Sequence, residues 1–291
     1  MRYTTISLFV LLLLSCEPSL PSHAQDSIIG EPRQAKPTTK LVKLNQDSNT
    51  LSARFAPPEG AKRVKMDTSS FAAYLRNLPL KPHGAKVHYF DGREKRNTYV
   101  HAAVIDMDVG DRDLQQCADA IIRLRAEYLF QRKTYSEIHF NFTNGFKADY
   151  QKWRAGQRIK VDGNSVSWIP GSKEDGSYKS FRSYLNMVFA YAGTQSMEKE
   201  LKPVELDSIE IGDIFIQGGS PGHAIIVVDM AIDEETEERF FLLAQSYMPA
   251  QEMHILNNPQ NKALSPWYSN KLQGRLVTPE WMFDKGDLKR F

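Results

Sequence analysis

Three residues of this chain have the types and the order that cysteine-based hydrolysis needs. Cys117 lies in the segment QQCADAIIRLRAEYL, His223 follows a glycine-proline turn, and Gln245 lies in the apolar run RFFLLAQSY. A thiol becomes a strong nucleophile when a nearby histidine takes its proton, and the histidine later returns that proton to a leaving amine. Gln245 would fix the tautomer of the imidazole. The three residues therefore predict a nucleophile, a base and an orienting group.

Both reactive residues also have a structural interpretation, and the sequence leaves it open. The first turn of a helix favours the thiolate of Cys117, because its free N–H groups and dipole stabilise negative charge. Cys117 also falls on an apolar stripe, however, and free cysteine is among the most buried residue types. His223 can equally be a hydrogen-bonded residue at a strand edge, although the glycines before it indicate a close backbone approach, as beside a cleft.

The segment GDIFIQGGSPGHAIIVVDMA predicts a β-hairpin that carries His223 at one end. Asp213–Gln217 should pair with His223–Val228 across the turn GGSPG. This arrangement would put His223 at the end of a sheet, beside a concave surface.

A third strand, RFFLLAQSY, follows the charged turn DEETEE. Pairing Ala231 with Arg239 across this turn puts Ile225 opposite Gln245. Because side chains alternate between the faces of a strand, His223, Gln245 and Tyr247 should then share one face.

Two amphipathic helices are predicted, one on each side of an alternating strand at 137–145. In the first helix Asp113 and Gln116 have capping-box spacing, and the apolar stripe that follows consists of Leu114, Cys117, Ile121, Leu124 and Tyr128. The second helix runs from Ser177 to Gly193, where the glycine ends it. Together with the strands, these helices predict an α+β fold in which helices pack against an antiparallel sheet. The tail from Gln251 to Phe291 has little regular pattern and should wrap the core.

The order of these elements resembles that of the NlpC-type and CHAP-type papain-like cysteine hydrolases, which cut peptide bonds in bacterial cell walls. Gly212-Asp213, Gly222-His223 and Gln245 carry the resemblance, which covers about residues 177–247. It implies a divergent papain-like fold, with Cys117 as nucleophile, His223 as base and Gln245 as orienting residue. The whole chain, with its QQCADAIIRLRAEYL and LLAQSYMPAQ segments, also resembles a family of uncharacterised bacterial cell-envelope lipoproteins.

The chain departs from the NlpC-type pattern at the nucleophile. That pattern has its cysteine at the start of the helix before "GD", a position that falls near Phe181–Ser183 here, where no cysteine is found. The nucleophile is therefore missing, or it has moved to Cys117, or a serine, Ser180 or Ser183, serves instead.

Other polar residues are assigned no chemistry or only a minor part. His139, with Asn141, is a minor alternative partner for Cys117. The remaining histidines lack metal-ligand spacing, so neither a metal site nor a cofactor is predicted. The aspartates between 106 and 113 are interpreted as helix caps rather than as a calcium loop.

The beginning of the chain, MRYTTISLFVLLLLSC, is typical of a secretory signal peptide. LLSC resembles a bacterial lipobox, so we expect residues 1–16 to be a signal peptide and Cys16 to carry a lipid anchor. The alternative is cleavage at Ala24, which would leave a periplasmic or secreted protein.

Composition indicates a flexible tether over residues 17–65 and a single domain over 66–291. The formal net charge is +2, and no basic stripe predicts binding to nucleic acid. With only two cysteines, one of them Cys16, a disulfide framework is excluded.

These observations favour an exported, lipid-anchored cell-envelope hydrolase whose partners are a membrane and a cell-wall peptide or glycan. The alternative is a catalytically inactive binding or structural lipoprotein on the same scaffold.

Overall fold

A nine-stranded sheet forms the centre of the computed structural model, which describes residues 42–291. Its strands run in the order β2-β11-β10-β9-β8-β15-β7, with β1 beside β9 and β12 beside β10, and all of its pairs are antiparallel. The strands are β1 (Lys62–Arg63), β2 (His101–Val104), β7 (Lys202–Pro203), β8 (Ile214–Gln217), β9 (His223–Ile232), β10 (Arg239–Gln245), β11 (His254–Leu256), β12 (Tyr268–Ser269) and β15 (Leu288–Arg290).

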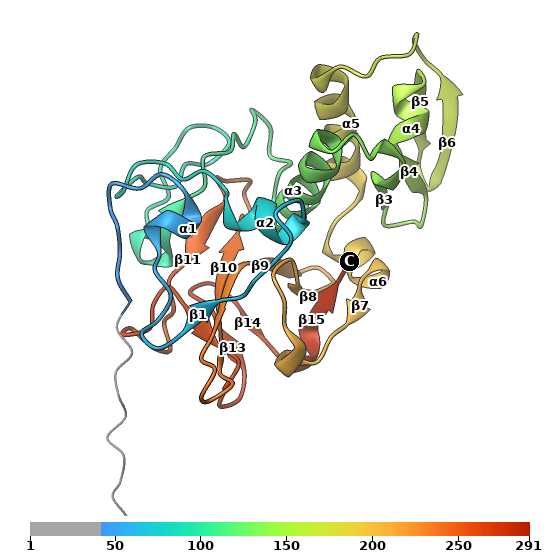
Figure 1. Cartoon of the computed structure of the whole chain (residues 1–291). Helices are drawn as coiled ribbons and strands as arrows, with labels where there is room; N and C mark the ends of the chain where they lie inside the picture. Colours follow the sequence, from blue (N-terminus) through green and yellow to red (C-terminus); the bar gives the residue numbers. More distant parts are fainter. Residues whose placement is uncertain (1–41) are drawn as a thin grey trace, which may run out of the picture. The chain divides into compact units, whose positions relative to one another are not determined.

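Helices and three small two-stranded sheets surround this centre (Figure 1). The helices are α1 (Leu51–Arg54), α2 (Phe71–Arg76), α3 (Cys117–Gln131), α4 (Tyr150–Arg154), α5 (Tyr178–Tyr191) and α6 (Thr194–Glu200). The small sheets pair β3 (His139–Asn141) with β4 (Lys147–Asp149), β5 (Gln157–Asp162) with β6 (Ser165–Pro170), and β13 (Leu276–Val277) with β14 (Met282–Phe283). The fold is therefore mixed, mostly antiparallel sheet with a few helices, as the sequence predicted.

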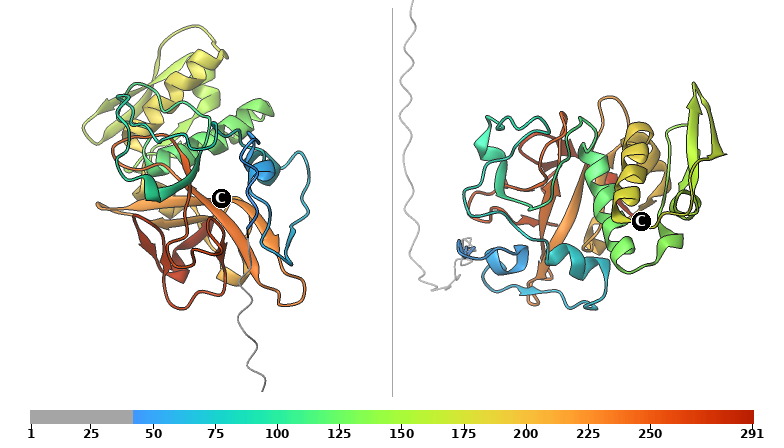
Figure 2. Two further views of the ribbon diagram at one scale, coloured as in Figure 1. Left: turned by 90° about the vertical axis from the view of Figure 1, so that its left-hand side faces the viewer. Right: turned by 90° about the horizontal axis from the view of Figure 1, so that it is seen from above.

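Strand β9 is buried on both faces, which explains its unbroken apolar run. Ala224, Ile226 and Val228 belong to the core on the side of the helices, whereas Ile225 and Val227 belong to a second core that includes residues of β13 and β14. Figure 2 shows the two layers, with the green and yellow helices on one side of the orange strands and the red strands on the other. Helix α3 lies against β9, so the first residue of the helix comes close to the start of the strand.

The predicted hairpin is confirmed. Gln217 pairs with His223 and Ile214 with Ile226, so the turn comprises residues 218–222. His223 is thus the first residue of β9, although its side chain is 1% exposed rather than open to a concave surface. Neighbouring side chains from the C-terminal tail cover it, and the sequence pattern gave no sign of them.

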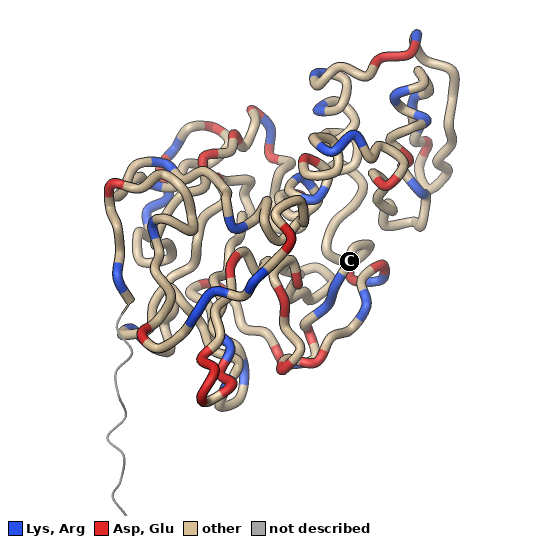
Figure 3. The backbone as a smooth tube through the Cα atoms, viewed as in Figure 1, with Lys and Arg blue, Asp and Glu red and all other residues tan. Residues whose placement is uncertain are grey.

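The predicted register between β9 and β10 is wrong by one residue at the turn and right at the other end. Ala231 pairs with Phe240, but a β-bulge between Leu242 and Leu243 shifts the register, so that Ala244 pairs with Ile226. Continuing this register puts Gln245 opposite Ile225, as predicted. The connecting turn, residues 233–238, is rich in acidic residues, and the tube in Figure 3 is red at this tip of the hairpin.

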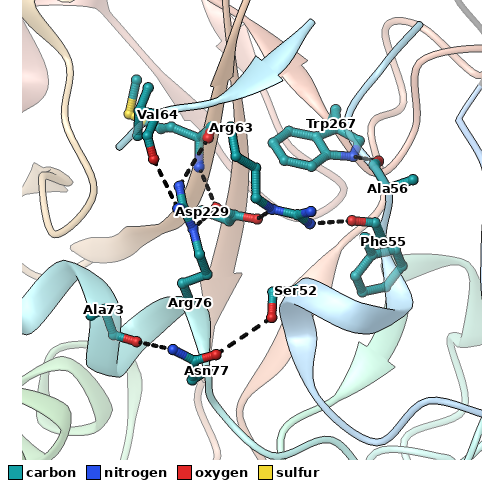
Figure 4. A network of polar contacts seen from close by, with 11 residues as sticks. Ser52, Phe55, Ala56, Arg63, Val64, Ala73, Arg76, Asn77, Asp229 and Trp267 are labelled. Atoms are coloured by element: carbon teal, nitrogen blue, oxygen red, sulfur yellow. Dashed lines mark hydrogen bonds and ion pairs between the residues drawn. The ribbon is translucent and has the colours of Figure 1, made fainter. Parts of the chain in front are cut away.

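Residues 42–65, which we expected to belong to the tether, form part of the folded unit. Leu51 and Phe55 are 0% and 1% exposed, and β1 pairs with β9. Arg63 donates from Nε to Asp229 Oδ2 at 2.7 Å, as Figure 4 shows. The composition predicts a tether because most of this segment is polar and only a few of its residues anchor it to the sheet. The signal peptide, Cys16, Ala24 and the rest of the tether lie outside the described residues.

Two further local predictions require correction. The N-cap of helix α3 is Gln116, three residues later than the predicted cap Asp113, because Asp119 Oδ2 accepts a hydrogen bond from the backbone of Gln116 at 3.1 Å. The C-terminal tail forms five short strands rather than irregular chain, and three of them, β11, β12 and β15, belong to the main sheet. The second predicted helix is confirmed as α5, with Ser177 as its N-cap.

Within residues 42–291, no helix has the length and apolar character needed to cross a membrane.

Candidate functional site

Cys117 opens helix α3 and is 8% exposed. The backbone N–H groups of Ala118 and Ala224 favour its thiolate, and Ala224 is the residue after His223. Burial and the charge of Asp119 act more strongly in the opposite direction and raise the pKa of the Cys117 thiol to about 11. The thiol is therefore neutral at pH 7 in the empty site.

His223 is enclosed by aromatic side chains. Its ring centroid lies 4.7 Å from that of Tyr247, 5.4 Å from that of Trp281 and 6.0 Å from that of Phe283. Burial lowers the pKa of His223 to about 4, with a smaller contribution from the charge of Lys95. Burial raises the pKa of Tyr247, with smaller contributions from the negative charges of Glu280 and of Cys117 in its thiolate form.

Gln245 binds His223, as the sequence predicted. Its Oε1 accepts a hydrogen bond from His223 Nε2 at 2.9 Å. An amide oxygen accepts and cannot donate, so this bond requires the proton on Nε2 and leaves the lone pair on Nδ1. His223 is thus held in the tautomer whose other nitrogen is free to act as a base.

Two acceptors determine which way the Gln245 amide points. Its Nε2 donates to Glu280 Oε2 at 2.7 Å and lies 3.3 Å from His254 Nε2. His254 Nδ1 lies 2.9 Å from the carbonyl oxygen of Glu252, so Nδ1 carries the proton and Nε2 accepts. A flipped amide would direct its oxygen at the Glu280 carboxylate, and the hydrogen-bond pattern therefore assigns Oε1 to His223.

Lys95 compensates the charge of Glu280. The Lys95 Nζ lies 2.6 Å from Glu280 Oε1 and donates to Gln251 Oε1 at 2.9 Å. The lysine is 5% exposed and also lies over the Tyr247 ring, 5.4 Å from its centroid. Burial lowers the pKa of Lys95, while Glu280 acts to raise it.

Sequence reasoning missed Lys95, His254 and Glu280. Lys95 lies in the charged run GREKRN, which resembles a solvated loop, and Glu280 lies in TPEWMF, whose pattern predicts irregular chain. The only available signal was the proximity of Glu280 to Trp281 in a tail that was expected to wrap the core. No sequence pattern indicates that three distant segments converge on Gln245.

A hollow of about 280 Å³ lies beside Cys117. Its lining comes from the start of α3, the start of α6 and the turn before His223. The residues include Asp113, Cys117, Asp119, Phe189, Thr194 and Gly222. A bound molecule in this hollow would therefore be next to the thiol.

The alternative sequence candidates lie elsewhere. His139 lines a separate hollow with Arg125 and Glu200. Ser180 accepts a hydrogen bond from Trp153 Nε1 at 3.2 Å, and Ser183 donates to the carbonyl of Lys179 at 3.0 Å. None of the three serine and histidine alternatives lines the hollow beside Cys117.

The aspartates near the start of α3 make the polar contacts of a helix terminus. Asp108 pairs with Arg123 at 2.6 Å, and Asp113 Oδ1 accepts from the backbone of Ala250 at 2.7 Å. In the part of the chain that the structure describes, no three His, Cys, Asp or Glu side chains gather closely enough to hold a metal ion.

Comparison with protein families identifies the class of the chain. Residues 51–290 match the model of a domain of unknown function, DUF4846, and the chain belongs to this family. No match was found among curated proteins or among solved structures.

Proposed function

We propose that the protein is a cysteine hydrolase of the papain-like kind, acting on a peptide or a related amide. One observation carries the proposal: a thiol at a helix N-terminus lies beside a hollow and contacts the backbone of Ala224, the residue after a histidine whose tautomer is fixed by an oriented amide. A nucleophile, a base and an orienting group are the three parts that cysteine hydrolysis uses.

The chemistry would run in two halves. Cys117 Sγ attacks the carbonyl carbon while His223 Nδ1 takes the thiol proton. The tetrahedral intermediate then collapses, the C–N bond breaks, and His223 gives the proton to the leaving amine, which leaves a thioester on Cys117. In the second half His223 takes a proton from water, the hydroxide attacks the thioester, and the proton returns to the thiolate as the acid is released.

The pKa values favour a neutral resting pair over a preformed thiolate and imidazolium. Values of about 11 for Cys117 and about 4 for His223 put the ion pair at a cost of about 10 kcal/mol, at about 1.4 kcal/mol per pKa unit. Proton transfer should therefore accompany attack on a bound substrate rather than precede it.

The beginning of the chain supports a location for this activity. LLSC after the apolar run favours export, lipidation of Cys16 and attachment to a bacterial membrane. A protein that is anchored in this way and hydrolyses amides would lie close to cell-wall peptides, which fits such a peptide as its substrate. Cys16→Ala should move the protein from the membrane fraction to the soluble fraction, and an unchanged distribution would refute the anchor.

The full-length protein can be tested on peptides released from purified cell wall. We expect the wild type to produce new amino groups and Cys117→Ala to lower the rate at least about 10³-fold. His223→Ala should have a comparable effect, and Ser183→Ala, in α5, serves as the control variant. Equal release by the wild type and Cys117→Ala would reject the hydrolase proposal.

A second candidate function is a binding module that has lost catalysis. The observation that favours it is the burial of Cys117, which opposes the thiolate. Such a module would bind cell-wall peptides with the same affinity in the wild type and in Cys117→Ala, and would release no amine from either.

A further inference from the structure

The buried carboxyl group of Asp119 lines the hollow beside Cys117. Asp119 is the third residue of α3 and is 6% exposed. Its Oδ2 accepts from the backbone of Gln116 at 3.1 Å. Within residues 42–291, its other oxygen, Oδ1, has no hydrogen-bond partner although it is buried. Buried polar atoms are nearly always paired, so this oxygen lacks a donor that a bound molecule can supply.

The charge of the lining indicates what kind of donor that is. Asp113 and Asp119 both line the hollow, and the other lining residues include no lysine and no arginine. A carboxylate or phosphate would meet two acidic groups there without a compensating cation. An ammonium group would bring the missing donor and positive charge together.

We infer that this hollow binds a primary ammonium group of the substrate, with Asp119 Oδ1 as its acceptor. The inference rests on the proposed function and names the substrate class for the same site: a peptide with a free amine close to the bond that is cut. Apolar lining from Leu114, Phe189 and Met248 would contact the carbon chain that carries the amine.

Binding of the amine would also change the thiol. Burial raises the pKa of Asp119 well above its usual value, which is the cost of keeping this carboxylate without a counterion. Its negative charge in turn helps to raise the pKa of Cys117. An ammonium group on Asp119 cancels that charge, so a correct substrate would make the nucleophile easier to deprotonate.

The amine has two possible sources, a free peptide N-terminus and a side chain such as that of lysine. Both present the same group, and three probes separate them. Ala-Ala-Ala amide has only the terminal amine, acetyl-Ala-Lys-Ala amide has only the side-chain amine, and acetyl-Ala-Ala-Ala amide has neither.

Binding of these probes is measured on full-length Cys117→Ala by NMR shifts of the backbone amides near the start of α3. We expect one or both amine probes to bind at least about 10-fold more tightly than the fully blocked peptide. Asp119→Asn in the same background should remove this preference, because it keeps a cap acceptor for Gln116 but loses the charge. Asp113→Asn is the matched control, since its Oδ1 already has partners, and it should keep the preference.

The comparison of free and blocked peptides requires no change at position 119, so it remains decisive even if Asp119→Asn fails to fold. Equal binding of all three probes, or a preference that survives in folded Asp119→Asn, overturns the inference. Because binding is measured without the thiol, these results are separate from hydrolysis. A selective site in a protein that cuts nothing would reject the proposed function alone, whereas cleavage without amine preference would reject the inference alone.

Discussion

Strand β9 carries two buried polar clusters, and they are built on opposite principles. Near its end, Asp229 is 0% exposed and binds Arg63 at 2.7 Å and Arg76 at 2.5 Å. Its Oδ1 also accepts from the backbone N–H of Met230 at 2.8 Å. This cluster, shown in Figure 4, is saturated: each carboxylate oxygen has a charged donor.

At the start of the strand lies His223, and the backbone of the next residue, Ala224, contacts Cys117 of α3. We call His223, Cys117 and Asp119 the His223 cluster, and this cluster is not saturated. Burial keeps His223 and Cys117 in their neutral forms, and Asp119 nearby has an oxygen without a partner among the described residues. A hollow opens beside this cluster, whereas arginine side chains fill the space around Asp229. The difference indicates that the Asp229 cluster holds the N-terminal segment to the sheet, and that the His223 cluster is arranged to receive a ligand.

The largest effect is expected from breaking the saturated cluster. Asp229→Ala leaves Arg63 and Arg76 without their counterion, and loss of one partner of a buried ion pair costs about 3–5 kcal/mol. The free energy of unfolding, measured with urea at pH 7.5, should fall by about this amount. Lys62, which also belongs to β1, makes only an exposed ion pair with Glu234, so Lys62→Ala should leave the free energy of unfolding nearly unchanged. If the two variants are equally stable, Asp229 does not hold the N-terminal segment, residues 42–65, to the sheet.

A smaller loss of stability is expected at acidic pH, and it should come from the buried histidines at and around His223. Burial lowers the pKa of His223 to about 4 and of His254 to about 3. Below about pH 6.5 the unfolded chain therefore binds protons that the folded protein does not, and stability falls as the pH falls. Each histidine should cost about 2 kcal/mol between pH 7.5 and pH 5.

The raised pKa of Asp119 works in the opposite direction, because the folded protein then takes up a proton before the unfolded chain does. Asp119→Asn removes this offset, so urea unfolding at the two pH values should show a steeper loss of stability in the variant. A wild-type stability that does not change from pH 7.5 to pH 5 would contradict the neutral, buried state of the two histidines.

The features of the site around His223 that could be predicted depend on residues close together in the sequence. Glycine and proline at the turn and the alternation of apolar residues predicted the β8–β9 hairpin and the shared face of His223, Gln245 and Tyr247. The register at the turn was wrong because a β-bulge depends on how β10 fits its other neighbours, which alternation alone does not reveal. The bulge restored the expected pairing at the site.

The parts that could not be predicted depend on contacts between distant segments. Glu280 is 35 residues from Gln245 in sequence, and the tail brings it there through pairing of β15 with β8. The anchoring of residues 51–63 rests on two buried apolar side chains, the pairing of β1 with β9 and one ion pair to Asp229. A polar segment with so few fixed points resembles a linker in composition.

The third prediction concerns Glu280. Its role decides whether the network around His223 orients a functional site or only stabilises the fold, as the Asp229 cluster does. Glu280 is the stronger of the two acceptors that point the Gln245 oxygen at His223, at 2.7 Å compared with 3.3 Å for His254. In Glu280→Gln this acceptor loses its charge, so the Gln245 amide should flip in part of the molecules. Those molecules would present an N–H to His223 Nε2, which forces the proton onto Nδ1 and removes the base.

The measurement is the ¹⁵N spectrum of the imidazole, which distinguishes a protonated from an unprotonated ring nitrogen. We expect an Nε2-protonated His223 in the wild type, a mixture in Glu280→Gln, and a fall in hydrolysis of about 10-fold to 100-fold, equivalent to about 1–3 kcal/mol. Stability is controlled with Lys95→Met/Glu280→Gln, because Lys95 is buried and the single variant leaves its charge with only Gln251. The double variant should regain stability but not the tautomer. A purely structural role would give the reverse pattern: Glu280→Gln would lose stability while His223 keeps its proton on Nε2. Both clusters of β9 would then be structural.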